Sequence, residues 1–471
     1  MGSSRPLAMV ASALALLLAE GCCPKPQPAA PPVTPASPCP AELAAPQRLP
    51  GSEPHHRDSG FWIGRLAAPD AVVLEPGEIA ALNQRGETRW QEDDFGFRRN
   101  LAAAPIAHGP VLEQLRRDIR SIRELSAAGK RVLLDGTQPP AELFDRVDAL
   151  VAAGKGSGEL RAALTLVPMR SLPMSEGLYE KAGDVDFDLM HASSLRAGEL
   201  VQVVSVHPDG WRLVRSDYAY GWIQGGLSPA IAEAEARAYH RPERFVVVTA
   251  DSVPVWASAD RRMLLLAARI GLRLPLAAAQ EEGSALVRVR VPSPQGLVDG
   301  WVARADVHEG AMPLTRRNLF RHAFRQLDDR FGWGGMEGDR DCSRFLLDLF
   351  ALFGLDLPRN SAYQAESGSW TVPLEGLSLE QKGAAIDGAS ARGLVLAFMK
   401  GHIMLMIGKD DGRHFAIHQF SGYRVPCQDG PDTKMVVSRV AVSDLQLGEG
   451  SARKSFIERL TKLIIFGRRA E

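Results

Sequence analysis

The segment that most constrains this chain is a glycine-rich loop over 332–338, followed by Asp341-Cys342-Ser343 and a long apolar stretch. Over 345–353 large apolar residues recur at helical spacing, which predicts a buried helix face, and a glycine then ends the pattern. Cys342 falls in the first turn of that helix. The positive end of a helix favours a thiolate, and the loop leaves the helix start open to a ligand. We therefore interpret Cys342 as a nucleophile rather than an inert buried cysteine.

A base for this thiol is expected in the hairpin that follows. Two apolar runs flank a turn over 409–412, which is typical of a β-hairpin. If the turn centres near residue 410, His402 lies directly opposite His418, with Cβ atoms about 5 Å apart. One imidazole then orients the other, so we predict His402 as the base and His418 as the third member. His414 has the same parity and stays open as the alternative third member. No recognised zinc-ligand spacing is present, so we predict no metal site.

These motifs resemble the NlpC/p60 family of papain-like cysteine peptidases. The resemblance rests on "GWGG", "DCSRF", "LFGLDLPRNSAYQ", "GHIMLMIG" and "AIHQFSG", over about residues 315–425, with the cysteine before the histidine as in the unpermuted branch. It implies hydrolysis of the γ-D-glutamyl to diamino-acid bond of peptidoglycan stem peptides, without a cofactor. By position, it implies the same roles for Cys342, His402 and His418, and four residues on the substrate side: Asp341, Ser343, Trp333 and Ser361.

The middle of the chain carries two similar sets of short β-type runs separated by glycine turns. The sets end in Gly221-Trp222 and Gly300-Trp301, so two diverged copies of one small barrel are the economical interpretation. This ending resembles bacterial SH3 (SH3b) modules, which are often wall-targeting. The resemblance to enzymes with such a module ahead of an NlpC/p60 domain implies that the module closes one end of the cleft. A stem peptide would then enter by its free N-terminal amine. We expect Tyr218 and Asp341 to form that gate, with Asp188 a weaker candidate.

Before the barrels, the spacing predicts an amphipathic helix over 111–125 and a second helix over 142–153. We therefore predict an α+β fold, a papain-like NlpC/p60 catalytic domain preceded by two SH3b-like β-barrels and a helical N-terminal region. The expected divisions are a signal peptide over 1–21, a Pro-rich linker over 22–58, the helical stabilising region over 59–157, the barrels over 158–235 and 236–308, and the catalytic domain over 309–471.

The first residues have the layout of an export signal. One arginine precedes an apolar run of about 20 Å, which is shorter than a bilayer's hydrocarbon core. The run ends in Gly21-Cys22, which resembles a lipoprotein cleavage box, so we expect lipidation at Cys22 and a periplasmic, membrane-anchored protein. Ten of residues 24–50 are proline, as suits an extended tether. We interpret Cys427 as a free thiol, with a disulfide to Cys39 as the open alternative.

Charge excludes one class of partner. Lys and Arg total 55 against 56 Asp and Glu, so no surplus of positive charge is present to bind a phosphate backbone. We therefore expect peptidoglycan stem peptides rather than nucleic acid as the partner, and a monomer. Two alternatives stay open: a catalytically silent wall-binding protein, and an amidase or transpeptidase acting on another stem amide.

Overall fold

The computed structural model describes residues 39–91, 108–278, 280 and 283–468. The signal peptide, Cys22 and the first part of the Pro-rich segment lie outside these ranges. Within them, no helix combines the length and apolar character needed to cross a bilayer.

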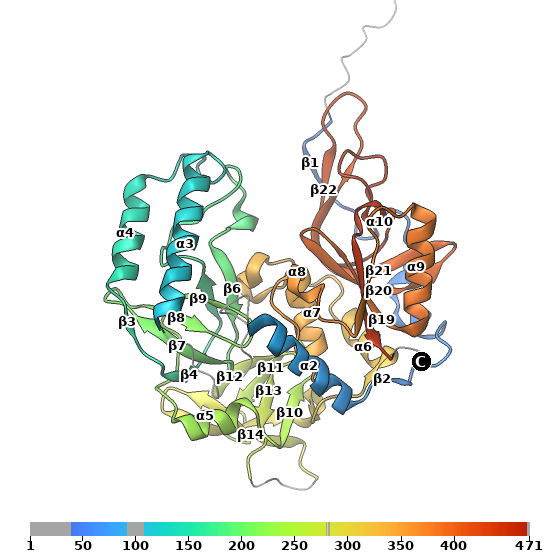
Figure 1. The fold of residues 1–471 in the computed structure, drawn as a ribbon. Coiled ribbons are helices and arrows are strands. Elements are labelled where there is room, and N and C mark those ends of the chain that lie inside the picture. The colour runs from blue at the N-terminus through green and yellow to red at the C-terminus, as the bar shows by residue number, and fades with distance from the viewer. Residues whose placement is uncertain (1–38, 92–107, 279, 281–282, 469–471) are drawn as a thin grey trace, which may run out of the picture.

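The C-terminal part is built on a seven-stranded sheet (Figure 1). Its strands pair antiparallel, except that the first strand runs parallel to its neighbour. In spatial order they are β1 (Glu42–Ala44), β22 (Thr433–Asp444), β21 (Arg413–Val425), β20 (His402–Asp410), β19 (Gly393–Met399), β23 (Lys462–Gly467) and β18 (Trp370–Pro373).

Helices cover both faces of this sheet. Ile403 and Leu405 point into one core together with Phe345 and Phe350 of α7, whereas Met404 points into a second core beneath α9. The alternation follows from the pleat, which sends successive side chains to opposite faces. The helices and short turns of this part are α6 (Arg316–Phe324), η4 (Trp333–Gly338), α7 (Cys342–Ala351), α8 (Ser361–Gln364), α9 (Leu379–Arg392) and α10 (Phe456–Arg459).

The chain between α4 and α5 forms a curved antiparallel sheet, drawn in green in Figure 1. We call this sheet the first β unit. The two expected helices are present, as α3 (His108–Ala127) and α4 (Ala141–Ala152), and they share a core with Trp222 of this sheet. Its elements are β3 (Lys155–Gly156), β4 (Leu160–Ala162), β5 (Val167–Arg170), η2 (Val185–Phe187), β6 (His191–Leu195), β7 (Leu200–Val206), β8 (Trp211–Arg215) and β9 (Tyr220–Gln224).

A second β unit follows after α5 (Glu233–His240). It has a four-stranded and a three-stranded sheet around a single valine-rich core. Its elements are β10 (Phe245–Val248), β11 (Ser252–Trp256), β12 (Leu264–Arg269), β13 (Arg273–Pro275), β14 (Leu286–Ser293), β15 (Gly296–Ala303), η3 (Arg304–Asp306) and β16 (Val307–Glu309).

The repeated Gly-Trp pair has one physical reason in both units. A Cβ on Gly221 would lie 3.0 Å from the carbonyl oxygen of Arg170, and one on Gly300 would lie 2.7 Å from a methyl group of Val255. Glycine therefore lets a neighbouring strand approach closely. The tryptophans differ: Trp222 is fully buried in its core, whereas Trp301 is half-buried beneath the guanidinium of Arg288.

The N-terminal segments divide between two cores. Trp62 and Leu82 join the core of the C-terminal sheet, whereas Leu115 and Phe144 join that of the first β unit. The elements of the first group are η1 (Pro54–Arg57), α1 (Ser59–Ile63), β2 (Val72–Leu74) and α2 (Pro76–Gln91), with β2 pairing with β17 (Leu314–Thr315). The segment expected as one helical region thus packs in two places.

The linker prediction is wrong for residues 39–57. This stretch runs beside β22, where β1 extends the sheet and the buried Leu49 enters its second core. Arg439 of β22 donates to the carbonyl oxygens of Pro46 and Gln47. Prolines stop the segment from forming a core of its own, but they do not stop it from adding to an existing sheet edge.

Candidate active site

The glycine-rich loop is seated on β6 of the first β unit. Gly334 and Gly335 both have positive φ, and a Cβ on Gly334 would lie 2.5 Å from the carbonyl oxygen of His191. Ser194 of the same strand donates to the carbonyl oxygen of Gly335 at 2.8 Å. Glycine is required here for both the backbone conformation and the close approach. The loop that precedes Cys342 is therefore shaped by another part of the chain.

Asp341 caps the N-terminus of α7. Its Oδ1 accepts the backbone N–H of Arg344 at 2.9 Å and the Ser343 hydroxyl at 3.0 Å, and its Oδ2 accepts the Gly334 N–H at 3.1 Å. Arg359 adds two donors, at 3.1 and 2.7 Å. Burial would raise the pKa of Asp341, but the charge and hydrogen bonds of Arg359 outweigh it and leave the pKa below its ordinary value. Asp341 is thus an ionised helix cap, and both of its carboxylate oxygens accept hydrogen bonds.

Cys342 is the first residue of α7 and is half-buried against the core beside β20. The backbone N–H groups of Ile403 and Ser343 hydrogen-bond to its sulfur and favour the thiolate. Burial nevertheless raises the pKa of the Cys342 thiol to about 12, and the negative charge of Asp341 adds to that rise. The environment of Cys342 thus raises its pKa, against the direction expected from the helix terminus alone. The helix terminus is outweighed by desolvation and by the carboxylate that caps the same turn.

Two histidines and a serine continue from β20 across the sheet. His402 Nε2 lies 2.7 Å from His418 Nδ1, and His418 Nε2 lies 2.8 Å from Ser443 Oγ. Burial lowers the pKa of His402 to about 3, with Arg459 and Arg453 adding to the effect, and it lowers the pKa of His418 well below its ordinary value. Both rings are neutral at neutral pH. The predicted contact between His402 and His418 is confirmed.

Aromatic side chains hold the histidine pair in place. The His418 ring stacks on Phe420 with centroids 4.1 Å apart, and Phe456 meets it edge-on at 5.3 Å. His402 directly precedes Ile403, whose N–H reaches the Cys342 sulfur, and the charge of Asp341 acts on the His402 ring. Two adjacent residues at the start of β20 thus connect the two groups, Ile403 toward Cys342 and His402 toward His418.

The alternative third member, His414, lies elsewhere. Its Nε2 lies 2.7 Å from a carboxylate oxygen of Asp387 on α9. Asp387 also binds Lys409 at 2.8 Å. His414 thus belongs to an ion-pair cluster near the hairpin turn, and no contact joins it to His402 among the described residues.

The other predicted substrate-side residues surround the start of α7. The Ser343 hydroxyl lies between Asp341 and Arg359. Trp333 is half-buried and packs at 5.5 Å on Phe187 of η2. Ser361 opens α8, which Gln364 ties to α7 by donating to the carbonyl oxygen of Ser343 at 2.8 Å.

Tyr218 is placed differently from the prediction. Its hydroxyl donates to Glu199 Oε2 at 2.5 Å, and its ring lies under the guanidinium of Arg344. It lines a cavity of about 160 Å³ with Arg344 and Asp348, on a side of α7 that Cys342 does not share. Asp188, the weaker candidate, is bound by Arg170 at 3.0 Å. Both side chains are engaged by partners within the protein.

Three polar residues of this region were not predicted. Arg359 neutralises Asp341, Ser443 ends the histidine series, and Gln364 joins α8 to α7. Arg359 and Gln364 lie within the "PRNSAYQ" motif, so that signal was available. Ser443 has no local signal, because it reaches the site only through the pairing of β21 with β22.

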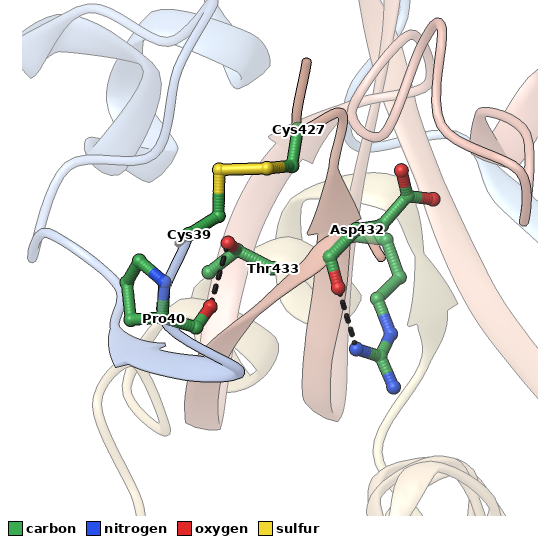
Figure 2. The surroundings of a disulfide bond; sticks show 6 residues. Cys39, Pro40, Cys427, Asp432 and Thr433 are labelled. Atoms are coloured by element: carbon green, nitrogen blue, oxygen red, sulfur yellow. Dashed lines mark hydrogen bonds between the residues drawn. A yellow bond between two sulfur atoms is a disulfide. The ribbon is translucent and has the colours of Figure 1, made fainter. Parts of the chain in front are cut away.

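The expectation of a free thiol at Cys427 is wrong. Cys427 forms a disulfide with Cys39 (Figure 2). Beside the bond, Thr433 donates to the carbonyl oxygen of Pro40 at 2.7 Å, at the point where β1 joins β22. The two cysteines are 388 residues apart, so nothing local in the sequence connects them. Cys342 is the free cysteine of the described residues.

One group of metal-type ligands occurs within the described ranges, away from Cys342. His55, His56 and Asp410 bring one ligand atom each within 4.8 Å of the others. However, His56 Nδ1 accepts the backbone N–H of Glu53, so its Nε2 carries the proton directed at Asp410. Arg65 occupies the other carboxylate oxygen at 2.7 Å. This arrangement is an ion-paired cluster, because a metal-bound imidazole needs an unprotonated nitrogen at the ion.

Comparison with known proteins agrees with this geometry. Residues 328–434 match the model of the NlpC/P60 family. No curated protein matches the chain. An NlpC/P60 endopeptidase from Photobacterium damselae subsp. piscicida has a similar structure, with a TM-score of 0.69, 16% identity, and coverage of 91% of this chain and 100% of that chain.

A second similar structure is an NlpC/P60 family protein from Bacillus cereus ATCC 10987. It has a TM-score of 0.43 and 18% identity, and it covers 66% of this chain and 100% of that one. Members of the NlpC/P60 family are cysteine peptidases that generally hydrolyse cell-wall peptidoglycan. Residues 328–434 of this chain, which hold Cys342, His402 and His418, form an NlpC/P60 family domain.

Proposed function

We propose that this protein is a cysteine endopeptidase that hydrolyses the γ-D-glutamyl to diamino-acid bond of peptidoglycan stem peptides. The observation that carries the proposal is the hydrogen-bonded pair His402 and His418, which begins directly before Ile403, the β20 residue whose backbone N–H acts on the Cys342 sulfur at the start of α7. The family of the domain indicates the substrate class. Within that class, this bond is the one that the sequence resemblance implies.

In the proposed mechanism, the resting thiol and imidazole are both neutral. As the Cys342 sulfur attacks the γ-glutamyl carbonyl carbon, its proton passes to His402 Nδ1, the ring nitrogen not used by His418. The N–H groups of Ser343 and Ile403 favour negative charge at the sulfur, and we assign them the same role for charge that develops beside it. His402 then protonates the leaving amine, and water hydrolyses the thioester to regenerate the thiol. A neutral thiol and a neutral imidazole suit these reaction steps, because the buried site then holds no separated charges before substrate binds.

We further propose that stems with a free N-terminal L-Ala are preferred. The support is the packing of β6 against Gly334 and Gly335. Because of this contact, the first β unit covers the loop that precedes Cys342. The amine is not assigned to Tyr218 and Asp341, because the Tyr218 hydroxyl is bonded to Glu199 and the Asp341 carboxylate to Arg359. Tyr218→Phe is therefore expected to leave the preference unchanged.

We also propose that the protein acts after export, as a periplasmic lipoprotein anchored through Cys22, and that its two β units are SH3b-like wall-binding modules. The Cys39–Cys427 disulfide supports export, because such bonds persist in oxidising compartments. The Gly-Trp pairs, which serve the same close strand approach in both units, support a common origin of the modules.

The test is digestion of L-Ala-γ-D-Glu-diamino-acid peptides by the purified protein, followed by mass spectrometry, with Cys342→Ala as the blank. We expect L-Ala-D-Glu and the free diamino acid as products, and slower cleavage of N-acetylated peptides. Cleavage at another amide would assign the amidase or transpeptidase alternative. Binding to wall fragments without cleavage of any stem would assign the silent wall-binding alternative. Equal rates on free and acetylated stems would remove the amine preference alone.

A further inference from the structure

Ser443 is a fully buried serine that the mechanism above does not use. It lies on β22, and its Oγ is 2.8 Å from His418 Nε2. His418 is itself fully buried, and its other ring nitrogen faces His402 Nε2 at 2.7 Å. The three side chains thus form one unbranched series of polar contacts that ends at the serine.

Such a series has two self-consistent proton arrangements. A neutral imidazole carries a single N–H, so the role of one ring nitrogen sets the role of the other. If Ser443 Oγ accepts from His418 Nε2–H, His418 Nδ1 accepts from His402 Nε2–H, and His402 Nδ1 is left with a lone pair. If Ser443 donates instead, every contact reverses and His402 Nδ1 carries a proton. Only the first arrangement allows His402 to take a proton from the thiol.

We propose that Ser443 is a positioning residue that accepts from His418 and thereby fixes the tautomer in which His402 acts as a base. The choice between the two arrangements rests on the proposed function, because only the first leaves His402 a lone pair for the thiol proton, but the measurement of the tautomer does not depend on it. The Cys342 sulfur already receives the N–H groups of Ile403 and Ser343. In the reversed arrangement the site therefore holds one more donor and no nitrogen lone pair for the thiol proton. The low pKa values of both rings agree with single-proton, neutral imidazoles.

The tautomer is measured directly by ¹⁵N NMR of the full chain labelled at histidine. We expect His402 to carry its proton on Nε2 in the wild type. In Ser443→Ala we expect a mixture of both tautomers, because the acceptor at the end of the series is gone. Ser443→Thr keeps the oxygen and should restore the single tautomer. A proton on His402 Nδ1 in the wild type, or an unchanged single tautomer in Ser443→Ala, would overturn the proposal.

The chain offers a matched control for serine removal. Ser205 is also fully buried, and its Oγ lies 2.9 Å from His207 Nε2 in the first β unit, away from Cys342. Ser205→Ala should leave the His402 spectrum and the stem-peptide kinetics unchanged. A change in His402 as large as that caused by Ser443→Ala would show that removal of any buried serine loosens the fold, and would overturn the assigned role.

Kinetics supply the second readout. We expect Ser443→Ala to lower kcat about five- to tenfold while KM stays within about twofold, because the net loss is one hydrogen bond that orients the base. In a His418→Asn background the same substitution should have little effect, since an amide oxygen accepts from His402 without a tautomer to fix. Equal effects in both backgrounds would contradict the proposal. If no stem peptide is hydrolysed at all, the proposed function fails, whereas the NMR result still decides the role of Ser443.

Discussion

Buried polar groups lie on two sides of α7, and they are neutral on one side and charged on the other. On the side toward β20, Cys342, His402 and His418 are all neutral, because burial moves each pKa toward the uncharged form. On the side toward the β units, Arg344 and Asp348 are just as buried but stay charged. The difference lies in their partners, since a buried group stays charged only where an opposite charge is within bonding distance.

The charged side is a dense network around one carboxylate. The Asp348 carboxylate forms ion pairs with three guanidinium groups, those of Arg196 at 2.5 Å and of Arg340 and Arg344 at 2.8 Å each. Burial would raise the pKa of Asp348, but these three guanidinium groups hold it well below its ordinary value. Arg196 belongs to the first β unit, and Arg340 also binds Asp251 of the second. The network therefore joins three parts of the chain at the helix that carries the nucleophile candidate.

The largest expected effect tests the neutral side. His402→Ala should lower kcat on stem peptides by about a thousandfold or more, because it removes the proposed general base. His414→Ala is the matched control on the same hairpin, since that ring binds Asp387 instead. It should change kcat by less than about twofold. A larger loss with His414→Ala than with His402→Ala in steady-state assays would exchange their roles.

The next effect tests the charged side. Asp348→Asn should destabilise the protein by about 3–5 kcal/mol, because three buried guanidinium groups lose their shared charge partner. Asp387→Asn removes a half-exposed partner of Lys409 and should cost less than about 1 kcal/mol. Urea unfolding followed by fluorescence measures both. Similar values for the two variants would mean that the network does not depend on charge.

A smaller loss is expected from the disulfide, which lies on neither side of α7. Cys39→Ser should destabilise the protein by about 2–4 kcal/mol, because the bond closes a loop of nearly the whole chain. Cys427→Ser and the double variant should match it, since each removes the same bond. We expect kcat to be unchanged at low temperature. A double variant clearly less stable than either single one would assign the cysteines a second role.

The smallest effect concerns the boundary between the β units and the site. Burial lowers the pKa of His191 to about 4, so the folded protein binds its proton less readily than the unfolded chain. The contribution of His191 to the free energy of unfolding is therefore fully present above about pH 6.5 and decreases as the pH falls toward 4. At pH 5 the loss relative to neutral pH is about 2 kcal/mol. His191→Gln should flatten urea-unfolding stability over that interval. An unchanged pH dependence would exclude His191 as a contributor.

The hairpin shows how far local pattern predicts geometry. A turn over 409–412 and the pairing of the two apolar runs follow from the sequence. The structure pairs Asp410 with Arg413 and Leu405 with Ile417, so the turn centres later than expected, at Asp411 and Gly412 with positive φ. Continuing this register sets His402 diagonal to His418 rather than opposite it. Their rings still meet, because diagonal neighbours on one face are within reach of long side chains.

What the sequence determined by itself is therefore local. The spacing of apolar residues placed Cys342 at a helix start, and the turn residues placed both histidines on one hairpin, because helix and strand periods act over a few residues. The tertiary structure alone decided which groups carry charge and which cysteines pair. The neutral thiol, the charged Asp348 and the Cys39–Cys427 bond all depend on groups from distant segments. Desolvation and charge pairing act through space, and a linear pattern does not record the distances on which they depend.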